Sequence, residues 1–361
     1  MAVYLVSVVL ATAFLAYANG ANDNFKGVAT LYGSGTLGYK AALTWATVTT
    51  LAGSVVSIYF AELLVSRFSG KGLLPDAVIE APEFMLSVSL GAGITVIMAS
   101  RAGLPISTTH SLTGALVGAG FVSVGSDLRL SVLGYAFVMP LLVSPFLAAG
   151  LSATGYYGVV RVMKGSVRTG WRTRPTGFEG AGGKRTGHML DTSTLPEEAK
   201  LNEIPRAWTI NMMRLRDKGH VLSGGIVSFA RGLNDTPKIV ALLLAVEAME
   251  IAYGMLIVAT AMAFGGVLHS RRVAEVMSRG ITRIEPTKGL GANLVTGLLV
   301  IVASRLGLPV STTHVSVGSI VGNGLISRDA RWSAVGQIAL SWLLTLPAAA
   351  ISSALVYGML T

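Results

Sequence analysis

Two polar motifs interrupt otherwise apolar stretches of the sequence and carry its clearest chemistry. Asn22 and Asp23 recur as Asn234 and Asp235, at an offset of 212 residues, and each pair follows a glycine by two positions. An ionised carboxylate within a membrane-spanning stretch costs at least about 3 kcal/mol, which favours a functional reason for both aspartates. The glycines, and Pro237 after the second motif, predict a break in each helix. Carbonyls exposed at such a break, with the Asn and Asp side chains, would form a hard-oxygen cation site.

A second pair of motifs places hydroxyl side chains at predicted helix N-termini. Residues 105–110, Pro-Ile-Ser-Thr-Thr-His, recur as residues 309–314, Pro-Val-Ser-Thr-Thr-His, at an offset of 204. Proline suits the first turn of a helix, where unpartnered N–H groups and the helix dipole favour an anion. One capping hydroxyl is common in any helix, but three in a row in both halves predict ligand binding. We expect each motif at the tip of a helical hairpin.

The histidines that end these motifs do not predict a metal centre. A metal site generally needs three or four protein ligands, and the sequence has five histidines and no cysteine. We expect His110 and His314 to be packed or hydrogen-bonded within helices, with a proton-carrying role left open.

The composition places these motifs in a membrane protein. Of 361 residues, 52% are hydrophobic and 13% are charged, with a mean hydropathy of +0.63, whereas about a quarter of a soluble domain is charged. A disordered chain, a nucleic-acid-binding module and a soluble enzyme are thereby excluded. The net charge of +10 does not indicate nucleic acid, because the basic excess is concentrated in one loop between two apolar halves. Without cysteine, disulfides and thiolate metal sites are excluded too.

About ten apolar runs of spanning length, five on each side of that loop, predict an all-α polytopic membrane protein. We expect an N-terminal repeat (1–160), a basic connector (161–220) and a C-terminal repeat (221–361). The linkers 67–83 and 269–288 are equivalent, but the second is far more basic, which places them on opposite faces of the membrane. The prediction is two inverted-topology repeats with broken helices and hairpins, the connector being cytoplasmic and both termini extracellular. This architecture is typical of secondary transporters.

The repeat also discriminates among classes of function. A secondary transporter needs matched motifs, because each repeat supplies half of one site at the membrane midplane. An intramembrane enzyme would need one nucleophile, one base and one orienting group, without symmetry. A simple anion channel would not place two carboxylates where they repel the ion, and the sequence has no nucleotide-binding loop. We therefore predict a secondary active transporter and not an enzyme.

Two sets of residues also indicate a family. They are Gly20-Ala21-Asn22-Asp23 with Gly232-Leu233-Asn234-Asp235, and the two Pro-x-Ser-Thr-Thr-His motifs. Both sets resemble the inorganic phosphate transporter (PiT) family of cation-coupled symporters, and the resemblance covers both apolar halves. It implies phosphate import across the cell membrane, driven by a sodium or proton gradient, by an inverted repeat that forms a homodimer.

The substrate implied by the resemblance has an alternative, because the family includes proteins that look like sulfate permeases. Sulfate or another tetrahedral oxyanion is therefore the second candidate. We favour phosphate, which at neutral pH still carries a proton and can therefore donate a hydrogen bond to Asp23 or Asp235. Sulfate has no such proton, and a nearby carboxylate would repel it.

The resemblance further implies that both pairs of motifs build one site. It assigns substrate binding to Asp23, Asp235, Ser107, Thr108, Thr109, Ser311, Thr312 and Thr313. We add Lys26 and Lys238 to the substrate-binding residues because the two repeats would bring both near the same midplane site. Cation binding is assigned to Asn22, Asp23, Ser107, Asn234, Asp235 and Ser311, which would hold Na⁺ if transport is sodium-coupled. We expect no cofactor beyond the coupling ion, Na⁺ or H⁺. The expected partners are inorganic phosphate, that ion, the lipid bilayer and a second copy of the chain.

Lys26 and Lys238 depart from the family, whose usual motif continues Val-Ala-Asn-Ala and has asparagine at the lysine position. Each lysine lies three residues after an aspartate, so the two side chains can pair across one helical turn. The plainest interpretation is that the aspartates serve only this pairing. Three roles for the lysines stay open: each ammonium attracts the anion, each stands where a sodium ion would otherwise bind, or each snorkels away and does neither.

Overall fold

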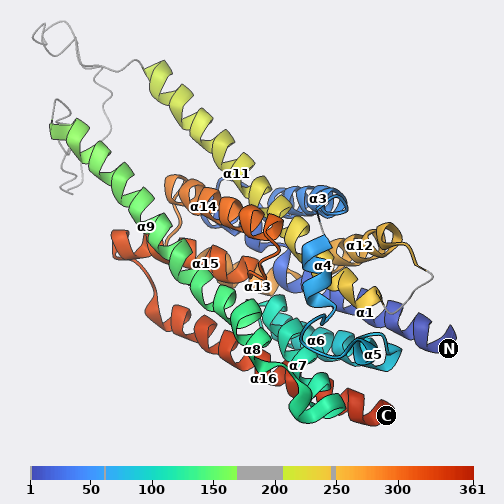
Figure 1. Cartoon of the computed structure of the whole chain (residues 1–361). Helices are drawn as coiled ribbons and strands as arrows, with labels where there is room; N and C mark the ends of the chain where they lie inside the picture. Colours follow the sequence, from blue (N-terminus) through green and yellow to red (C-terminus); the bar gives the residue numbers. More distant parts are fainter. Residues whose placement is uncertain (1, 61, 169–205, 245–248) are drawn as a thin grey trace, which may run out of the picture.

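The computed structural model describes residues 2–60, 62–168, 206–244 and 249–361 (Figure 1). Within these ranges the chain is helical, with one isolated β-bridge between Lys71 and Leu74 and no strand. The protein is therefore the all-α polytopic membrane protein that its hydropathy predicts. Much of the predicted connector lies outside the described residues, and its two ends belong to long helices from either half.

The helices of the first half follow one another with short connections. In chain order they are α1 (Ala2–Asp23), η1 (Lys26–Val28), α2 (Ala29–Gly33), α3 (Tyr39–Ser57), α4 (Glu62–Phe68), α5 (Asp76–Ile79), α6 (Pro82–Arg101), α7 (Thr108–Val124), η2 (Gly125–Asp127), α8 (Leu130–Val132), η3 (Leu133–Val138) and α9 (Met139–Arg168).

The long helices recur in the second half in the same order, but the short helices between them differ. Its elements are α11 (Arg206–Val240), η5 (Ala241–Leu243), α12 (Ile251–His269), α13 (Arg271–Glu275), η6 (Val276–Gly280), α14 (Pro286–Arg305), α15 (Thr312–Ser327) and α16 (Trp332–Leu360).

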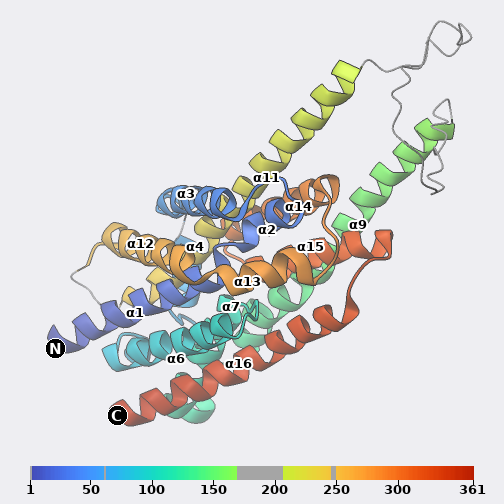
Figure 2. The same cartoon turned by 180° about the vertical axis from the view of Figure 1, so that it is seen from behind.

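The first helix of each half packs against one helix of its own half and one helix of the other half. α1 lies against α6 of its own half and α12 of the other, while α11 lies against α14 of its own half and α3 of the other. In the same crossed manner, α7 packs along α16 and α15 packs along α9. Figures 1 and 2 show that α1 and α11 start at opposite ends of the bundle, with both chain termini at the end where α1 starts. The halves are therefore repeats of inverted topology.

Among the described residues, six helices are long and apolar enough to cross a membrane, or seven if the bent pair of α3 and α4 is one span. The six are Val3–Gly33, Pro82–Arg101, Leu130–Arg161, Ile251–His269, Pro286–Arg305 and Trp332–Leu360. The count is lower than the ten apolar runs of the sequence for physical reasons. α7 and α15 have only 17 and 16 residues, fewer than the roughly 20 that a span needs. α11 carries three charged residues in its apolar part, Arg231, Asp235 and Lys238.

α6 with α7, and α14 with α15, form the two predicted helical hairpins. α6 ends at Arg101 and α14 ends at Arg305, and a glycine with positive φ follows each by two residues (Gly103, 75°; Gly307, 64°). In both hairpins the N–H of the next leucine returns to a carbonyl five residues earlier at 2.9 Å, which closes the helix C-terminus. Each hydroxyl motif therefore lies at the tip of a hairpin, as the sequence predicts.

The two aspartate motifs differ in their backbone. α1 ends at Asp23 and continues through the 3₁₀ turn η1 into α2, so the helix breaks here as predicted. α11 instead runs through Asp235 and Pro237 to Val240, so the break predicted at the second motif does not occur. Proline removes one N–H from a helix, but membrane helices tolerate this where neighbouring groups satisfy the freed carbonyl. Lys238 therefore stays one helical turn from Asp235.

The glycines before the two motifs allow close packing and do not break the helices. Gly20 lies inside α1, where an added Cβ would be 1.9 Å from the Met262 carbonyl oxygen of α12. Gly232 lies inside α11, where an added Cβ would be 2.1 Å from the Thr50 carbonyl oxygen of α3. Both distances are far inside van der Waals contact, so only glycine lets these backbones approach each other.

Candidate functional site

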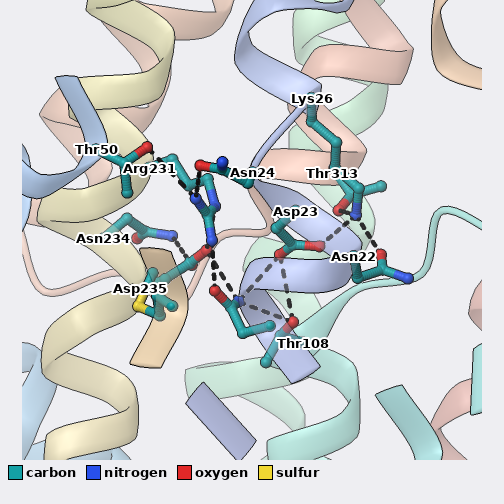
Figure 3. Close-up of polar contacts among 12 residues, drawn as sticks. Asn22, Asp23, Asn24, Lys26, Thr50, Thr108, Arg231, Asn234, Asp235 and Thr313 are labelled. Atoms are coloured by element: carbon teal, nitrogen blue, oxygen red, sulfur yellow. Dashed lines mark hydrogen bonds and ion pairs between the residues drawn. The ribbon is translucent and has the colours of Figure 1, made fainter. Parts of the chain in front are cut away.

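The two aspartates lie in one buried cluster that is built from both halves (Figure 3). Asp23, at the end of α1, is 2% exposed, and Asp235, within α11, is 3% exposed. The side-chain nitrogen of Asn19 lies between them, 3.1 Å from Asp23 Oδ2 and 3.3 Å from Asp235 Oδ2. The fold thus brings two motifs 212 residues apart into a single cluster.

Lys26 is held by oxygen atoms from both halves. Its Nζ lies 2.5 Å from Asp23 Oδ1 and 2.7 Å from Asn22 Oδ1, within its own motif. It also donates to the Ile106 main-chain carbonyl at 2.7 Å, at the tip of the first hairpin. Its fourth contact is Thr313 Oγ1 at 2.6 Å, in the second hairpin. The side chain is 2% exposed, so it does not snorkel to the membrane surface.

Lys238 repeats this arrangement with the halves exchanged. Its Nζ lies 3.4 Å from Asp235 Oδ1. It donates to the Val310 main-chain carbonyl at 2.7 Å, at the tip of the second hairpin, and to Thr109 Oγ1 at 2.9 Å, in the first. The side chain is 1% exposed. Each lysine therefore contacts the aspartate and a hairpin carbonyl of its own half, and the last threonine of the other half's hydroxyl motif.

The two asparagines connect each motif to the hairpin of its own half. Asn22 Nδ2 donates to Ser100 Oγ at 3.0 Å and to the Leu104 carbonyl at 2.9 Å. In the second half, Ser304 Oγ donates to Asn234 Oδ1 at 3.1 Å. Both amides therefore position the motifs in this conformation, and their use by a transported cation stays a prediction.

The first hydroxyl of each hairpin motif caps the helix that follows. Ser107 Oγ accepts the N–H of His110 at 3.1 Å, and Ser311 Oγ accepts the N–H of His314 at 3.3 Å. Capping accounts for these two serines, and cation binding by either stays a prediction. The histidine rings pack against each other with centroids 4.6 Å apart. Among the described residues, no group of His, Cys, Asp and Glu side chains is placed to hold a metal ion.

The threonines that follow the caps contact the charged groups. Thr108 Oγ1 donates to Asp23 Oδ2 at 3.2 Å, while Thr109 and Thr313 accept from the two lysines. Thr312 is buried in the same turn as Thr313. The helices α7 and α15 therefore begin at the cluster, and their N-termini add partial positive charge to it.

The sequence motifs do not include two further members of the cluster, Asn19 and Arg231. Arg231 is 1% exposed, with Nε 3.7 Å from Asp235 Oδ2 and with Nη2 donating to Asn19 Oδ1 at 2.6 Å. Its Nη1 donates to Asn24 Oδ1 at 3.1 Å. Asn19 and Arg231 occupy equivalent positions of the two repeats, at the same offset of 212. The sequence could have identified Arg231 as a functional residue, because it is an arginine inside the apolar part of α11. Asn19 is uncharged and is not repeated in the second half, so the sequence does not single it out.

The charges of the cluster do not cancel. Its buried charged side chains are Asp23, Asp235, Lys26, Lys238 and Arg231. With all five groups ionised, three cations against two carboxylates leave one formal positive charge in this buried cluster. Because an uncompensated buried charge is costly, the cluster favours the binding of an anion.

Two cavities beside the bundle have basic side chains in their walls. One, of about 580 Å³, lies at the end of α6, and its charged lining residues are Arg101, Arg271, Arg272 and Glu275. The other, of about 440 Å³, lies beside α4, and its charged lining residues are Arg67, Lys71 and Arg129. In the walls of both cavities basic side chains outnumber acidic ones.

Comparison with known proteins adds independent information. A protein of Pyrococcus abyssi named a phosphate permease is 27% identical over 400 residues, covering 99% of this chain and 97% of that protein. A Mycobacterium tuberculosis protein named a probable low-affinity inorganic phosphate transporter is 27% identical over 368 residues, covering 98% of this chain and 77% of that protein. A solved structure titled "The sodium-dependent phosphate transporter" shares the fold, with a TM-score of 0.78, 22% identity and 99% coverage of both chains. The model of the phosphate transporter family matches residues 19–353, and the chain therefore belongs to this family of transporters and not to a family of enzymes.

Proposed function

We propose that this protein imports inorganic phosphate across the cell membrane as a secondary active transporter, coupled to the inward flow of sodium ions or protons. One observation carries the proposal: two helix N-termini, three threonine hydroxyls and three buried cations converge from both repeats on one occluded cluster. Such groups stabilise the oxygens of a tetrahedral anion. Since both repeats contribute, movement of one against the other can expose the site to either side of the membrane.

The carboxylates favour phosphate over sulfate. Phosphate at neutral pH carries at least one proton, which Asp23 or Asp235 can accept in a hydrogen bond. Sulfate is fully deprotonated, and either carboxylate would repel it. The names of the relatives, a phosphate permease and a phosphate transporter, support the same choice.

Uptake of radiolabelled phosphate by the purified protein in liposomes tests the proposal. We expect arsenate, which is also tetrahedral and protonated, to compete with phosphate, and sulfate to compete weakly. Asp235→Asn should reduce uptake, because the neutral amide no longer balances Arg231 and Lys238 and accepts the substrate's proton less well. Strong competition by sulfate and none by arsenate would make the protein a sulfate permease.

The placement in the membrane and the assembly are also proposals. Charge distribution supports a cytoplasmic connector (161–220) between repeats 1–160 and 221–361, with both termini extracellular. The family resemblance supports a homodimer. Light scattering of the purified protein in detergent measures its mass, and a value of one protomer would contradict the dimer.

A further inference from the structure

Each lysine ammonium lies in a set of ligands that is typical of a bound metal cation. Around Lys26 Nζ there are four oxygens at 2.5 to 2.7 Å: a carboxylate, a side-chain amide, a main-chain carbonyl and a hydroxyl. An ammonium has only three N–H groups to donate, so one oxygen exceeds its hydrogen-bonding capacity. Hard cations are bound in proteins by these same oxygen types.

The second ammonium has three of these four kinds of ligand and lacks the side-chain amide. Lys238 Nζ is surrounded by a carboxylate, a hairpin carbonyl and a threonine hydroxyl at 2.7 to 3.4 Å. Both lysines are buried, which removes snorkelling as an explanation of their presence. Two equivalent oxygen-lined positions, one per repeat, are therefore each filled by a covalently attached positive charge.

The net charge of the site explains why a lysine at each of these two positions matters. With all five groups ionised, the cluster by itself carries one formal positive charge, so a bound dihydrogen phosphate makes it neutral. With a neutral asparagine at both lysine positions, the same occupied site would carry two negative charges. Two monovalent cations would then be needed to avoid a large cost of buried charge. The lysines supply those two charges permanently.

We propose, on the basis of the function proposed above, that Lys26 and Lys238 are resident cations in two coupling-ion positions, and that this protein takes up phosphate without sodium. The chain thereby differs from the solved transporter whose title names sodium dependence. At 22% identity that likeness extends to the fold alone.

The first experiment uses the wild-type protein. Uptake of radiolabelled phosphate into liposomes is measured in sodium chloride and in choline chloride of the same concentration, with the same inward proton gradient. We expect equal initial rates. Loss of uptake in choline chloride overturns the resident-cation proposal and leaves the proposed function standing, whereas absence of uptake in both salts contradicts the proposed function.

A binding measurement decides the proposal independently of transport. A ligand that binds only the folded protein raises its melting temperature. In detergent with phosphate present, replacing choline chloride with sodium chloride should leave the melting temperature of the wild type unchanged. A rise on adding sodium would overturn the proposal even if the liposomes show no transport.

The variants Lys26→Asn, Lys238→Asn and their combination sharpen both measurements. We expect the double variant to lose uptake in choline chloride, to regain uptake in sodium chloride, and to be stabilised by sodium. Lys288→Asn is the matched control, because Lys288 is a buried lysine that pairs with Asp329 at 2.8 Å, outside the cluster. This control should remain sodium-independent. Sodium-independent uptake by the double variant would overturn the proposal.

Discussion

Arg231 Nη2 donates to the side-chain oxygen of Asn19 at 2.6 Å, although the two residues occupy the same position in the two repeats. Two arginines here would repel each other, and two asparagines would bring no charge. The combination of one arginine and one asparagine adds a third cation and leaves a neutral amide between both aspartates. The cluster is therefore symmetric in its two lysine–threonine contacts but asymmetric in its charge.

Arg231→Met should weaken both stability and phosphate affinity. The substitution leaves Asp235 buried with Lys238 as its remaining cationic partner, and breaking a buried ion pair costs about 3–5 kcal/mol. Melting temperature in detergent and the apparent KM for phosphate uptake measure the two effects. Arg216→Met is the control in the same helix, because Arg216 forms an exposed pair with Asp217 that contributes at most about 1 kcal/mol. Equal effects of both substitutions would contradict a special role for Arg231.

Thr109→Val and Thr313→Val should each raise the KM for phosphate. Each removes the one hydroxyl that a lysine contacts in the opposite repeat, and a hydrogen bond to a charged group contributes about 1.5–3 kcal/mol. The control is Thr95→Val, whose hydroxyl bonds, within the part of the chain that the structure describes, only to the Gly91 carbonyl of its own helix at 2.8 Å. If Thr95→Val impairs uptake as strongly, loss of a hydroxyl in any helix explains the result.

Gly20→Ala and Gly232→Ala should lower the melting temperature of the protein. The added methyl groups would lie about 2 Å from a carbonyl of the crossing helix, and overpacking of this kind costs about 1–3 kcal/mol. Gly155→Ala, in α9, is the control because, apart from the backbone of α9 itself, no atom of the described residues lies within 4 Å of its Cβ position. Unchanged melting of the Gly20 and Gly232 variants would show that these helices can separate without penalty.

Single cysteines should report opposite faces for the two equivalent linkers. The chain has no native cysteine, so Asp76→Cys and Arg271→Cys can each be labelled alone with a membrane-impermeant maleimide. We expect Asp76→Cys to be labelled in intact cells and Arg271→Cys only after permeabilisation, because the second linker is the more basic one. Labelling of both from the same face would contradict the proposed membrane orientation of the repeats.

Asp329→Asn should remove a pH-dependent contribution to stability. Partial burial raises the pKa of Asp329, but hydrogen bonds from Lys288, Ser327 and Thr282 outweigh it and hold the pKa below the ordinary 3.8. A lowered pKa stabilises the folded state above the unfolded value, and this contribution is lost as the pH falls through the folded value. The difference in melting temperature between wild type and variant should therefore shrink on acidification. A difference in melting temperature that stays constant as the pH falls would contradict a lowered pKa of Asp329.

Several features of the site follow from spacing alone. Lys26 and Lys238 pair with Asp23 and Asp235 because three residues make one helical turn, and this holds whether the helix breaks, as after Asp23, or continues. The hairpins follow from Gly-Leu-Pro between two apolar runs, since glycine at positive φ ends one helix and serine caps the next.

Other features depend on tertiary packing that a sequence pattern does not contain. The bond between Lys26 and Thr313 joins residues 287 positions apart, and only the crossed packing of the halves brings them together. A comparison of the two repeats does not identify Asn19 and Arg231, because these equivalent positions hold different residues. The helix continues past Pro237 because packing of the two halves around it outweighs the local preference of proline.

The contacts at Gly20 and Gly232 have a mechanical consequence. Each is a backbone-to-backbone crossing with no side chain between the helices, so it can serve as a fulcrum about which one helix tilts against the other. α1 extends from this point as a lever roughly 30 Å long, at 1.5 Å per residue. Displacement in a tilt grows with distance from the fulcrum. Asp23 is only three residues from its fulcrum and Asp235 is equally close to the other, so the far ends of both helices can swing widely while the two carboxylates hardly move.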